Sequence, residues 1–241
     1  MLVKLNNPMI FARAIEIISE LIIEVKIKLT DAGLIITAID PANVAMVNLI
    51  IPKSSFSIYE PDNEVLGVNL DDLKKILKRC GVKSGLIFEK VKNTLAIKIE
   101  DRIKRNFTLS LIDVEAEEKE MPSLEYSSKV ELDSLDFVDS IEDCAVVSDA
   151  CSFIVENDKF IIEAKELNSA RSEFSSDEAK IEAENCKSRY SLEYLQKFIK
   201  GSKLFPKTIL NFAAEHPLRI DLISEALLIS FLLAPRMEIE D

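Results

Sequence analysis

The sequence predicts an α+β protein of two similar domains, each with two helices on one face of a mostly antiparallel sheet. Three observations support this class: a weak internal repeat, apolar residues at helical spacing in corresponding places of the two halves, and apolar strand-like runs separated by turn residues. Phe11 and Ile15 lie 126 positions before Phe137 and Ile141, and later segments match at offsets of 122 and 123. Because the matches occur in order, they favour a duplicated domain.

The first half begins with a predicted helix. Asn7 and Pro8 supply an N-cap and a proline at the first helical position, and an apolar stripe follows at Phe11, Ile15, Ile18 and Ile22. A second helix is expected from Asp71. The predicted strands are Lys26–Thr30, Leu34–Ile39, Leu86–Val91, Leu95–Ile99 and Phe107–Ile112.

The second half repeats this order. Asp133 or Ser134 would cap a helix, and a second helix is expected from Ser191. The apolar stripe of the first of these helices is Phe137, Ile141, Cys144 and Ala145, and the later strands are Ile209–Ala213, Leu218–Ile223 and Leu227–Leu233. The expected domains are 1–113 and 128–241. Between them, residues 113–125 carry six acids and one base, which is typical of a solvated linker, here 114–127.

Composition disfavours most enzymes and metal sites. The 241 residues are 48% hydrophobic and 30% charged, with a net charge of −12, five glycines and one histidine. His216 precedes Pro217 in an expected turn, and Asp71-Asp72 and Glu117-Glu118 read as a helix start and a linker, so no catalytic residue, metal or cofactor is assigned. No signal peptide or membrane span is evident, which predicts a cytoplasmic protein.

The four cysteines, Cys80, Cys144, Cys151 and Cys186, have no metal-ligand spacing. They are expected to be small buried thiols in a reducing interior. A disulfide between Cys144 and Cys151 stays open.

Positive charge is concentrated on the second helix of each half. Residues 71–83 and 190–207 each have a net charge of +3 in an otherwise acidic chain. The expected outward bases are Lys74, Lys75, Lys78 and Arg79 opposite Leu70, Leu73, Ile76 and Leu77, and Lys197, Lys200 and Lys203 opposite Tyr194, Leu195, Phe198 and Ile199. Lysine-rich faces are often only solvated, but equivalent basic helices in both halves favour sequence-independent contact with phosphates.

Several segments together resemble one known family, the archaeal and eukaryotic sliding clamp (proliferating cell nuclear antigen). These segments are Leu29-Thr30-Asp31-Ala32-Gly33 through Ile39-Asp40-Pro41-Ala42-Asn43-Val44, Gly67-Val68-Asn69-Leu70 with Lys75-Ile76-Leu77-Lys78, Met121-Pro122-Ser123-Leu124-Glu125-Tyr126, and Leu233-Ala234-Pro235-Arg236-Met237-Glu238. The resemblance covers essentially the whole chain and is closer to the archaeal type. It implies the DNA clamp fold and a trimeric ring with four helices of each subunit lining the hole.

The resemblance implies a clamp that encircles double-stranded DNA without reading its sequence. Its expected partners are other clamp subunits and, through short peptide motifs, DNA polymerase, clamp loader, flap endonuclease and DNA ligase. Arg13, Lys75, Lys78 and Lys200 match hole-facing basic positions of the family, and the helix faces add Lys74, Arg79, Lys197 and Lys203. A clamp-like scaffold of the checkpoint type, which recruits partners without serving replication, is the alternative.

Two further surfaces follow from the resemblance. The partner-peptide pocket matches Ile39, Val44, Met46, Met121, Pro122, Tyr126, Pro217, Leu232 and Pro235. The subunit interface would join a strand near Arg105–Leu111 to an edge strand near Ser169–Phe174 of another subunit, which would satisfy exposed backbone groups. Its expected residues are Arg105, Phe107, Leu109, Leu111, Arg171, Glu173 and Phe174, with Arg105, Arg171 and Glu173 as candidates for charge pairs.

One segment departs from the family pattern. Residues 131–143 have a net charge of −6 and no base, with acids at Asp133, Asp136, Asp139, Glu142 and Asp143. Facing DNA, this charge would be repulsive over roughly 8–10 Å. We therefore hypothesise that the chain is one of several non-identical ring subunits. A water-filled gap between this helix and DNA is the alternative, and homotrimer and heterotrimer both stay open.

Overall fold

The computed structural model describes residues 1–5, 7–115 and 119–237. The linker residues Glu117 and Glu118 and the end of the last family motif, Glu238, lie outside the described residues. The chain forms two compact units. The first comprises Met1–Pro41, Val47–Met121 and Ser224–Ile229, and the second comprises Ala42–Met46, Pro122–Ile223 and Ser230–Asp241.

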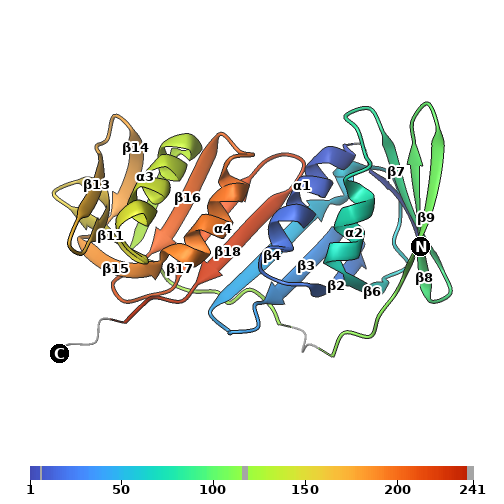
Figure 1. Ribbon diagram of the computed structural model, residues 1–241, viewed down its shortest axis with the longest axis horizontal. Coiled ribbons are helices and arrows are strands. Elements are labelled where there is room, and N and C mark those ends of the chain that lie inside the picture. The colour runs from blue at the N-terminus through green and yellow to red at the C-terminus, as the bar shows by residue number, and fades with distance from the viewer. Residues whose placement is uncertain (6, 116–118, 238–241) are drawn as a thin grey trace. The chain divides into compact units, whose positions relative to one another are not determined.

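The first unit contains two α-helices and a single 3-10 turn among its described residues (Figure 1). Its elements are β1 (Leu2–Leu5), α1 (Pro8–Ile18), β2 (Glu24–Thr30), β3 (Gly33–Ile39), β4 (Ala45–Pro52), η1 (Lys53–Ser55), β5 (Phe56–Glu60), β6 (Val65–Asn69), α2 (Leu70–Leu77), β7 (Gly85–Val91), β8 (Thr94–Glu100) and β9 (Lys104–Ser110). The strands form two sheets, with β5-β1-β7-β8-β9 in one and β4-β3-β2-β6 in the other.

The second unit is likewise built from two α-helices and two sheets among its described residues. Its elements are β10 (Ser128–Asp133), α3 (Ser134–Val147), β11 (Ala150–Glu156), β12 (Lys159–Lys165), β13 (Ser169–Phe174), β14 (Ala179–Ala183), β15 (Cys186–Ser191), α4 (Leu192–Ser202), β16 (Lys207–Phe212), β17 (Leu218–Ile223) and β18 (Leu228–Leu233). Here β13-β12-β11-β15 form one sheet, and β14-β10-β16-β17-β18 are neighbours in the other. The registered strand pairs of both units are antiparallel, so the predicted fold class is confirmed.

The helices begin where the sequence predicts a cap. The side chain of Asn7 accepts a hydrogen bond from the Met9 amide, with Pro8 in the first turn, and Asp133 accepts one from Leu135. The second helices begin at Leu70 and Leu192, each one residue from the prediction. The first helix ends at Ile18, so Ile22 is buried beyond it.

Each helix pair covers its unit's sheets on one side (Figure 1). In the second unit, α3 packs beside α4 and touches strands of both sheets, including β12 and β10. The core between them is aromatic: Phe153 makes edge contacts with Phe137, Phe160, Tyr190 and Phe212 at 5.3–6.2 Å between ring centroids. Because α3 and α4 rest on this rigid core, their outward faces form a fixed surface.

Close backbone approach fixes the chain that leaves β9. The Ile112 amide donates to the Gly67 carbonyl at 3.0 Å, and a Cβ at Gly67 would lie 1.9 Å from the Ile112 carbonyl oxygen. Only glycine fits there. The last strand of the first unit runs over Lys104–Ser110, so its predicted range of Phe107–Ile112 was wrong. Ile112 lies beyond the end of β9, and its hydrogen bond to Gly67 holds it against β6.

The four cysteines are free thiols, and no disulfide joins Cys144 to Cys151. These two are buried and hydrogen-bonded to each other, whereas Cys80 and Cys186 are only half-buried, which corrects the expectation of four buried side chains. Within the described residues, no helix has the length and apolar character that crossing a bilayer requires.

Candidate functional site

The basic face of the first unit lies on α2 and the neighbouring α1. Leu70, Leu73 and Leu77 are buried beneath α2, which leaves Lys75 and Lys78 exposed. Arg79 follows the helix and is also exposed, as is Arg13 on α1. The helix is short but well supported, because Asn69 caps it by accepting from the Asp72 amide at 3.2 Å and two acids occupy its first turn.

Lys74 does not project freely from this face, which corrects its predicted outward position. Its side chain is half-buried, and its Nζ lies 3.1 Å from Asp71 and donates to the Ser19 hydroxyl at 2.9 Å. Ile76, predicted to be buried, is only half-buried. Because α1 packs beside α2, Ser19 at the end of α1 is within hydrogen-bond distance of the lysine.

Three exposed bases of this face, Arg13, Lys75 and Lys78, are paired with acids of the same unit. One Glu16 carboxylate lies 3.6 Å from Arg13 and 3.4 Å from Lys78. Lys75 donates to Asp72 at 2.9 Å, and this hydrogen bond raises the pKa of Lys75. Exposed ion pairs of this kind contribute little to folding.

The second unit carries its bases on α4. Lys200 and Lys203 are exposed. Lys197 is half-buried, not outward as predicted, because its Nζ lies 3.2 Å from Glu193 and 5.1 Å from the centre of the Tyr194 ring. Tyr194 itself is half-buried, where the sequence predicted burial. A lysine over an aromatic face is weakly stabilised there and has less freedom to reach a ligand.

The acidic helix α3 lies directly beside α4. Asp136, Asp139, Glu142 and Asp143 are all exposed, as the pattern of residues 131–143 predicts. Glu142 lies 2.8 Å from Lys203, so one of these acids is neutralised by the basic helix. The surface of this helix pair is therefore mixed in charge, with a basic part on α4 and an acidic part on α3.

Most of the predicted peptide pocket belongs to the second unit. We call this part the apolar patch; it consists of Val44, Met46, Pro122, Tyr126, Pro217, Leu232 and Pro235. Met46 is buried, Pro122 is exposed and the others are half-buried. The Ala234 amide donates to the Val44 carbonyl at 2.9 Å, which holds these two segments together. Ile39 and Met121 belong to the first unit.

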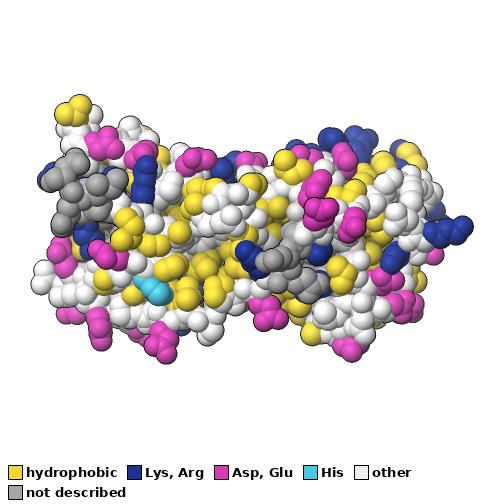
Figure 2. Space-filling model, turned by 90° about the horizontal axis from the view of Figure 1, so that it is seen from below, with side chains coloured by type: hydrophobic (Ala, Val, Ile, Leu, Met, Phe, Trp, Pro, Cys, Tyr) yellow, Lys and Arg dark blue, Asp and Glu magenta, His cyan; other side chains and the backbone are white. Residues whose placement is uncertain are grey.

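His216 lies beside the patch, although no functional role was expected of it. Its ring packs edge-on against Tyr126 with 5.6 Å between ring centroids, and Figure 2 shows hydrophobic side chains gathered around the histidine. Its backbone is held in place because its carbonyl accepts from the Tyr190 hydroxyl at 2.9 Å. The signal available in the sequence was its position immediately before Pro217.

Two polar atoms at this place are buried without a partner among the described residues: the Tyr126 hydroxyl and the His216 Nε2. Burial raises the pKa of Tyr126 to about 12, so its hydroxyl is neutral and able to donate. Unpaired buried polar atoms are costly in a folded protein. An incoming hydrogen-bonding group would remove that cost, which favours a polar contact at an otherwise apolar patch.

Residues 234–236, which we call the C-terminal strap, include Pro235 of the same patch. The Arg236 amide donates to the Arg189 carbonyl at 2.7 Å, and its guanidinium lies 2.7 Å from Asp149. This hydrogen bond lowers the pKa of Asp149. Pro235 is thereby fixed between two anchored residues, Ala234 and Arg236.

The expected interface strands are both at sheet edges. β9 ends the sheet order of the first unit, and β13 ends that of the four-stranded sheet. Leu109 and Phe174 are buried within their own units, while Phe107 and Leu111 are half-buried. Each edge strand therefore offers backbone groups on one side and is anchored by apolar side chains.

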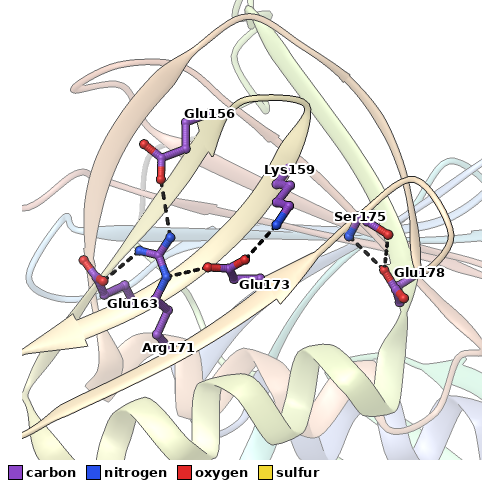
Figure 3. A network of polar contacts seen from close by, with 7 residues as sticks. All are labelled: Glu156, Lys159, Glu163, Arg171, Glu173, Ser175 and Glu178. Carbon is purple, nitrogen blue, oxygen red and sulfur yellow. Dashed lines mark hydrogen bonds and ion pairs between the residues drawn. The ribbon is translucent and has the colours of Figure 1, made fainter.

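The charge-pair candidates are already engaged within the chain. Arg171 bonds to Glu173 and Glu163 at 2.9 Å and to Glu156 at 3.4 Å, and Lys159 bonds to Glu173 at 3.1 Å (Figure 3). Arg105 pairs with Asp101. Arg171 therefore ties β13 to the two strands behind it and orders the edge.

Comparison with known proteins gives a consistent result. Residues 1–120 match the N-terminal domain model of proliferating cell nuclear antigen, and residues 120–236 match the C-terminal domain model. The chain is 39% identical over 236 residues to DNA polymerase sliding clamp 1 of Thermococcus kodakarensis, and 36% identical over 236 residues to the DNA polymerase sliding clamp of Pyrococcus horikoshii, covering 95% of each chain.

Two solved structures share the fold. Proliferating cellular nuclear antigen from Entamoeba histolytica superposes with a TM-score of 0.91 at 25% identity, covering 98% of both chains. A chain of the PCNA2–PCNA3 complex from Sulfolobus tokodaii gives 0.89 at 25% identity, covering 99% of this chain and all of the other. With both family models matched in order and full-length relatives well above 30% identity, this chain belongs to the proliferating cell nuclear antigen family of sliding clamps.

Proposed function

We propose that the chain is a subunit of a ring that encircles duplex DNA and tethers DNA polymerase and other enzymes to it. The observation that carries this proposal is the repeated pair of helices, of which the second is basic in each unit while the whole chain has a net charge of −12. A polyanion is attracted to those helices and repelled elsewhere. No catalytic step is assigned to any residue.

The proposed DNA contacts are made by exposed bases on α1, α2 and α4. Arg13, Lys75, Lys78, Arg79, Lys200 and Lys203 are their members, with Lys74 and Lys197 restrained behind them. Lysine side chains contact phosphates without reading bases, so such contacts permit sliding. A closed ring needs only weak contacts, because topology keeps it on the DNA.

The proposed partner site is the apolar patch together with His216. A short peptide with a glutamine and apolar anchors suits a patch with one buried thioether, three prolines and two polar atoms that have no partner among the described residues, the Tyr126 hydroxyl and the His216 Nε2. Ile39 and Met121, the other two residues that the family resemblance implies for this site, belong to the first unit, and Met121 lies within the proposed linker 114–127. DNA polymerase, clamp loader, flap endonuclease and DNA ligase are the proposed clients.

The proposed ring contact pairs β9 of one subunit with β13 of another. Two unpaired strand edges in one chain support it, since pairing them satisfies the exposed backbone groups. Whether the neighbour is a second copy or a related chain follows from sedimentation of the purified chain alone. A stable trimer of the chain alone would contradict our hypothesis of non-identical subunits.

Threading tests the function directly. The chain, together with any related chains with which it assembles, is allowed to slide onto a linear duplex fixed to a bead, and the free end is then blocked with a bulky protein. A closed clamp stays on the blocked DNA through a high-salt wash and leaves when a restriction enzyme cuts it. Loss of the assembled chains in the wash would contradict encirclement. Retention without longer polymerase products on primed circular DNA would favour the checkpoint-type scaffold.

A further inference from the structure

A carboxylate at one place in the repeat joins the two helices of each unit. In the first unit, Glu16 of α1 lies 3.4 Å from Lys78, which follows α2, and 3.6 Å from Arg13. In the second unit, Glu142 of α3 lies 2.8 Å from Lys203, which follows α4. Glu142 lies 126 positions after Glu16, the same spacing that separates Phe137 from Phe11. The two acids therefore match in the repeat, and each contacts the lysine at the C-cap of its unit's second helix. These two lysines lie 125 positions apart, so the lysine that matches Lys78 at the offset of 122 is Lys200 and not Lys203.

These contacts are too exposed to be explained by stability alone. The side chains of Glu16 and Lys78 are 39% and 60% exposed, and those of Glu142 and Lys203 are 52% and 50% exposed. Ion pairs with this exposure contribute little to folding and open readily. Both acids also lie beyond the first turn of their helices, so they do not serve the helix dipole there.

A phosphate offers each of these ammonium groups the same kind of partner as the carboxylate does. Binding of a phosphate to Lys78 or Lys203 therefore requires the lysine to leave its glutamate, which stays nearby with a negative charge. The glutamate then repels the phosphate over a distance shorter than the Debye length. The lysine gains less from DNA than an unpaired lysine would.

We infer that Glu16 and Glu142 compete with DNA phosphates for Lys78 and Lys203, and thereby set how loosely the clamp holds DNA. This inference rests on the proposed function, because it assumes that these helices face duplex. The competition reduces the time that each lysine spends on a phosphate, and it reduces the number of counterions that DNA binding releases. It gives the acidic residue of α3 a role in sliding that a purely repulsive surface would not have.

The test is the full-length double variant Glu16→Gln/Glu142→Gln. Its matched control is Glu89→Gln/Glu182→Gln, which changes the net charge equally and also removes one exposed lysine pair in each unit, at 2.7 Å from Lys98 and from Lys180. These control pairs lie on strands β7, β8 and β14 and not on the helices. Affinity for a short labelled linear duplex is measured by fluorescence anisotropy over a range of salt concentrations.

The helix variant is expected to bind duplex about tenfold more tightly at low salt, with a steeper dependence on salt and no advantage at high salt. The control is expected to bind like the wild-type chain. Equal tightening of both variants would assign the effect to net charge and overturn the inference, as would an unchanged helix variant. A lower unfolding temperature with no gain in affinity would also overturn it, since the carboxylates would then be structural.

Failure of the inference can be told from failure of the proposed function. The anisotropy comparison requires only that the chain contacts duplex, and it does not depend on a closed ring. Retention on end-blocked DNA does require a closed ring. A retained wild-type clamp with no difference between the variants contradicts only the inference. Adding Lys78→Gln and Lys203→Gln to the helix variant is expected to abolish its gain, and a gain that persists would show that other groups cause it.

Discussion

The ammonium of Lys203 lies 2.8 Å from the carboxylate of Glu142, so a basic residue that follows α4 and an acidic residue of α3 neutralise each other. The acidic helix is therefore not a uniformly repulsive surface. It supplies a local partner to the basic helix beside it, while Asp136, Asp139 and Asp143 stay exposed. Contact with DNA would depend on how easily such pairs open.

Replacing Lys75 and Lys200 with alanine is expected to weaken binding to duplex. Both side chains are exposed on the second helix of their units. Each lost phosphate contact should reduce the slope of log affinity against log salt by about 0.9. Anisotropy titrations at several salt concentrations measure this. Lys98→Ala/Lys180→Ala is the control, and an equal loss in both variants would contradict a specific role of the helices.

Replacing Arg171 with methionine is expected to loosen the β13 edge and weaken assembly. The substitution leaves Glu156, Glu163 and Glu173 close together without their shared cation. Arg171 and Lys159 lower the pKa of Glu173, so their support is present above the ordinary carboxylate pKa and is lost as the pH falls through the lowered one. Sedimentation at neutral and acidic pH measures assembly. If the variant assembles as the wild-type chain does at neutral pH, β13 is not part of the interface.

Removing the Arg236 side chain is expected to release the C-terminal strap. The hydrogen bond from Arg236 lowers the pKa of Asp149, so Arg236→Ala should return that pKa toward its ordinary value. The ion pair of Arg236 with Asp149 therefore stabilises the strap at pH values above the ordinary pKa of Asp149, and this stabilisation is lost as the pH falls through the lowered pKa. A carboxyl-detected NMR titration measures the shift. Arg219→Ala leaves the strap intact and should not move Asp149.

Replacing Tyr126 with phenylalanine separates the apolar and polar roles of the patch. The hydroxyl has no partner among the described residues, so its removal should leave the unfolding temperature unchanged or slightly higher. Binding of a synthetic peptide with a glutamine and apolar anchors should weaken if the hydroxyl bonds the peptide. Calorimetry measures both. Undiminished affinity would restrict Tyr126 to packing against His216.

Truncating Phe198 is expected to destabilise the second unit strongly. Its ring stacks on Phe231 with 4.4 Å between centroids, and both residues are completely buried. Phe198→Ala should lower the free energy of unfolding by about 3–5 kcal/mol, because it leaves a cavity that the packed core cannot fill. Denaturant unfolding measures the loss. Val82→Ala, at a side chain that is 84% exposed, should change little.

Local sequence signals predicted the helices well and the strands less well. Asn7 with Pro8, and Asp133, marked helix starts that the structure confirms, because a cap acts on amides within three residues of it. The division of each unit's strands into two sheets was not predictable in this way. Strand pairing joins residues far apart in the chain, such as Leu5 with Leu86, and local propensity does not specify such partners.

The sequence by itself determined the duplicated α+β architecture, the family and the basic character of the second helices, since these depend on order, spacing and charge. Only the tertiary structure decided which bases are paired: Glu16 with Lys78 and Glu142 with Lys203 meet because neighbouring helices pack side by side. It also decided that Lys74 and Lys197 are restrained and that His216 lies against Tyr126. Such contacts depend on the angle and distance between packed elements, and the period of a single element contains neither.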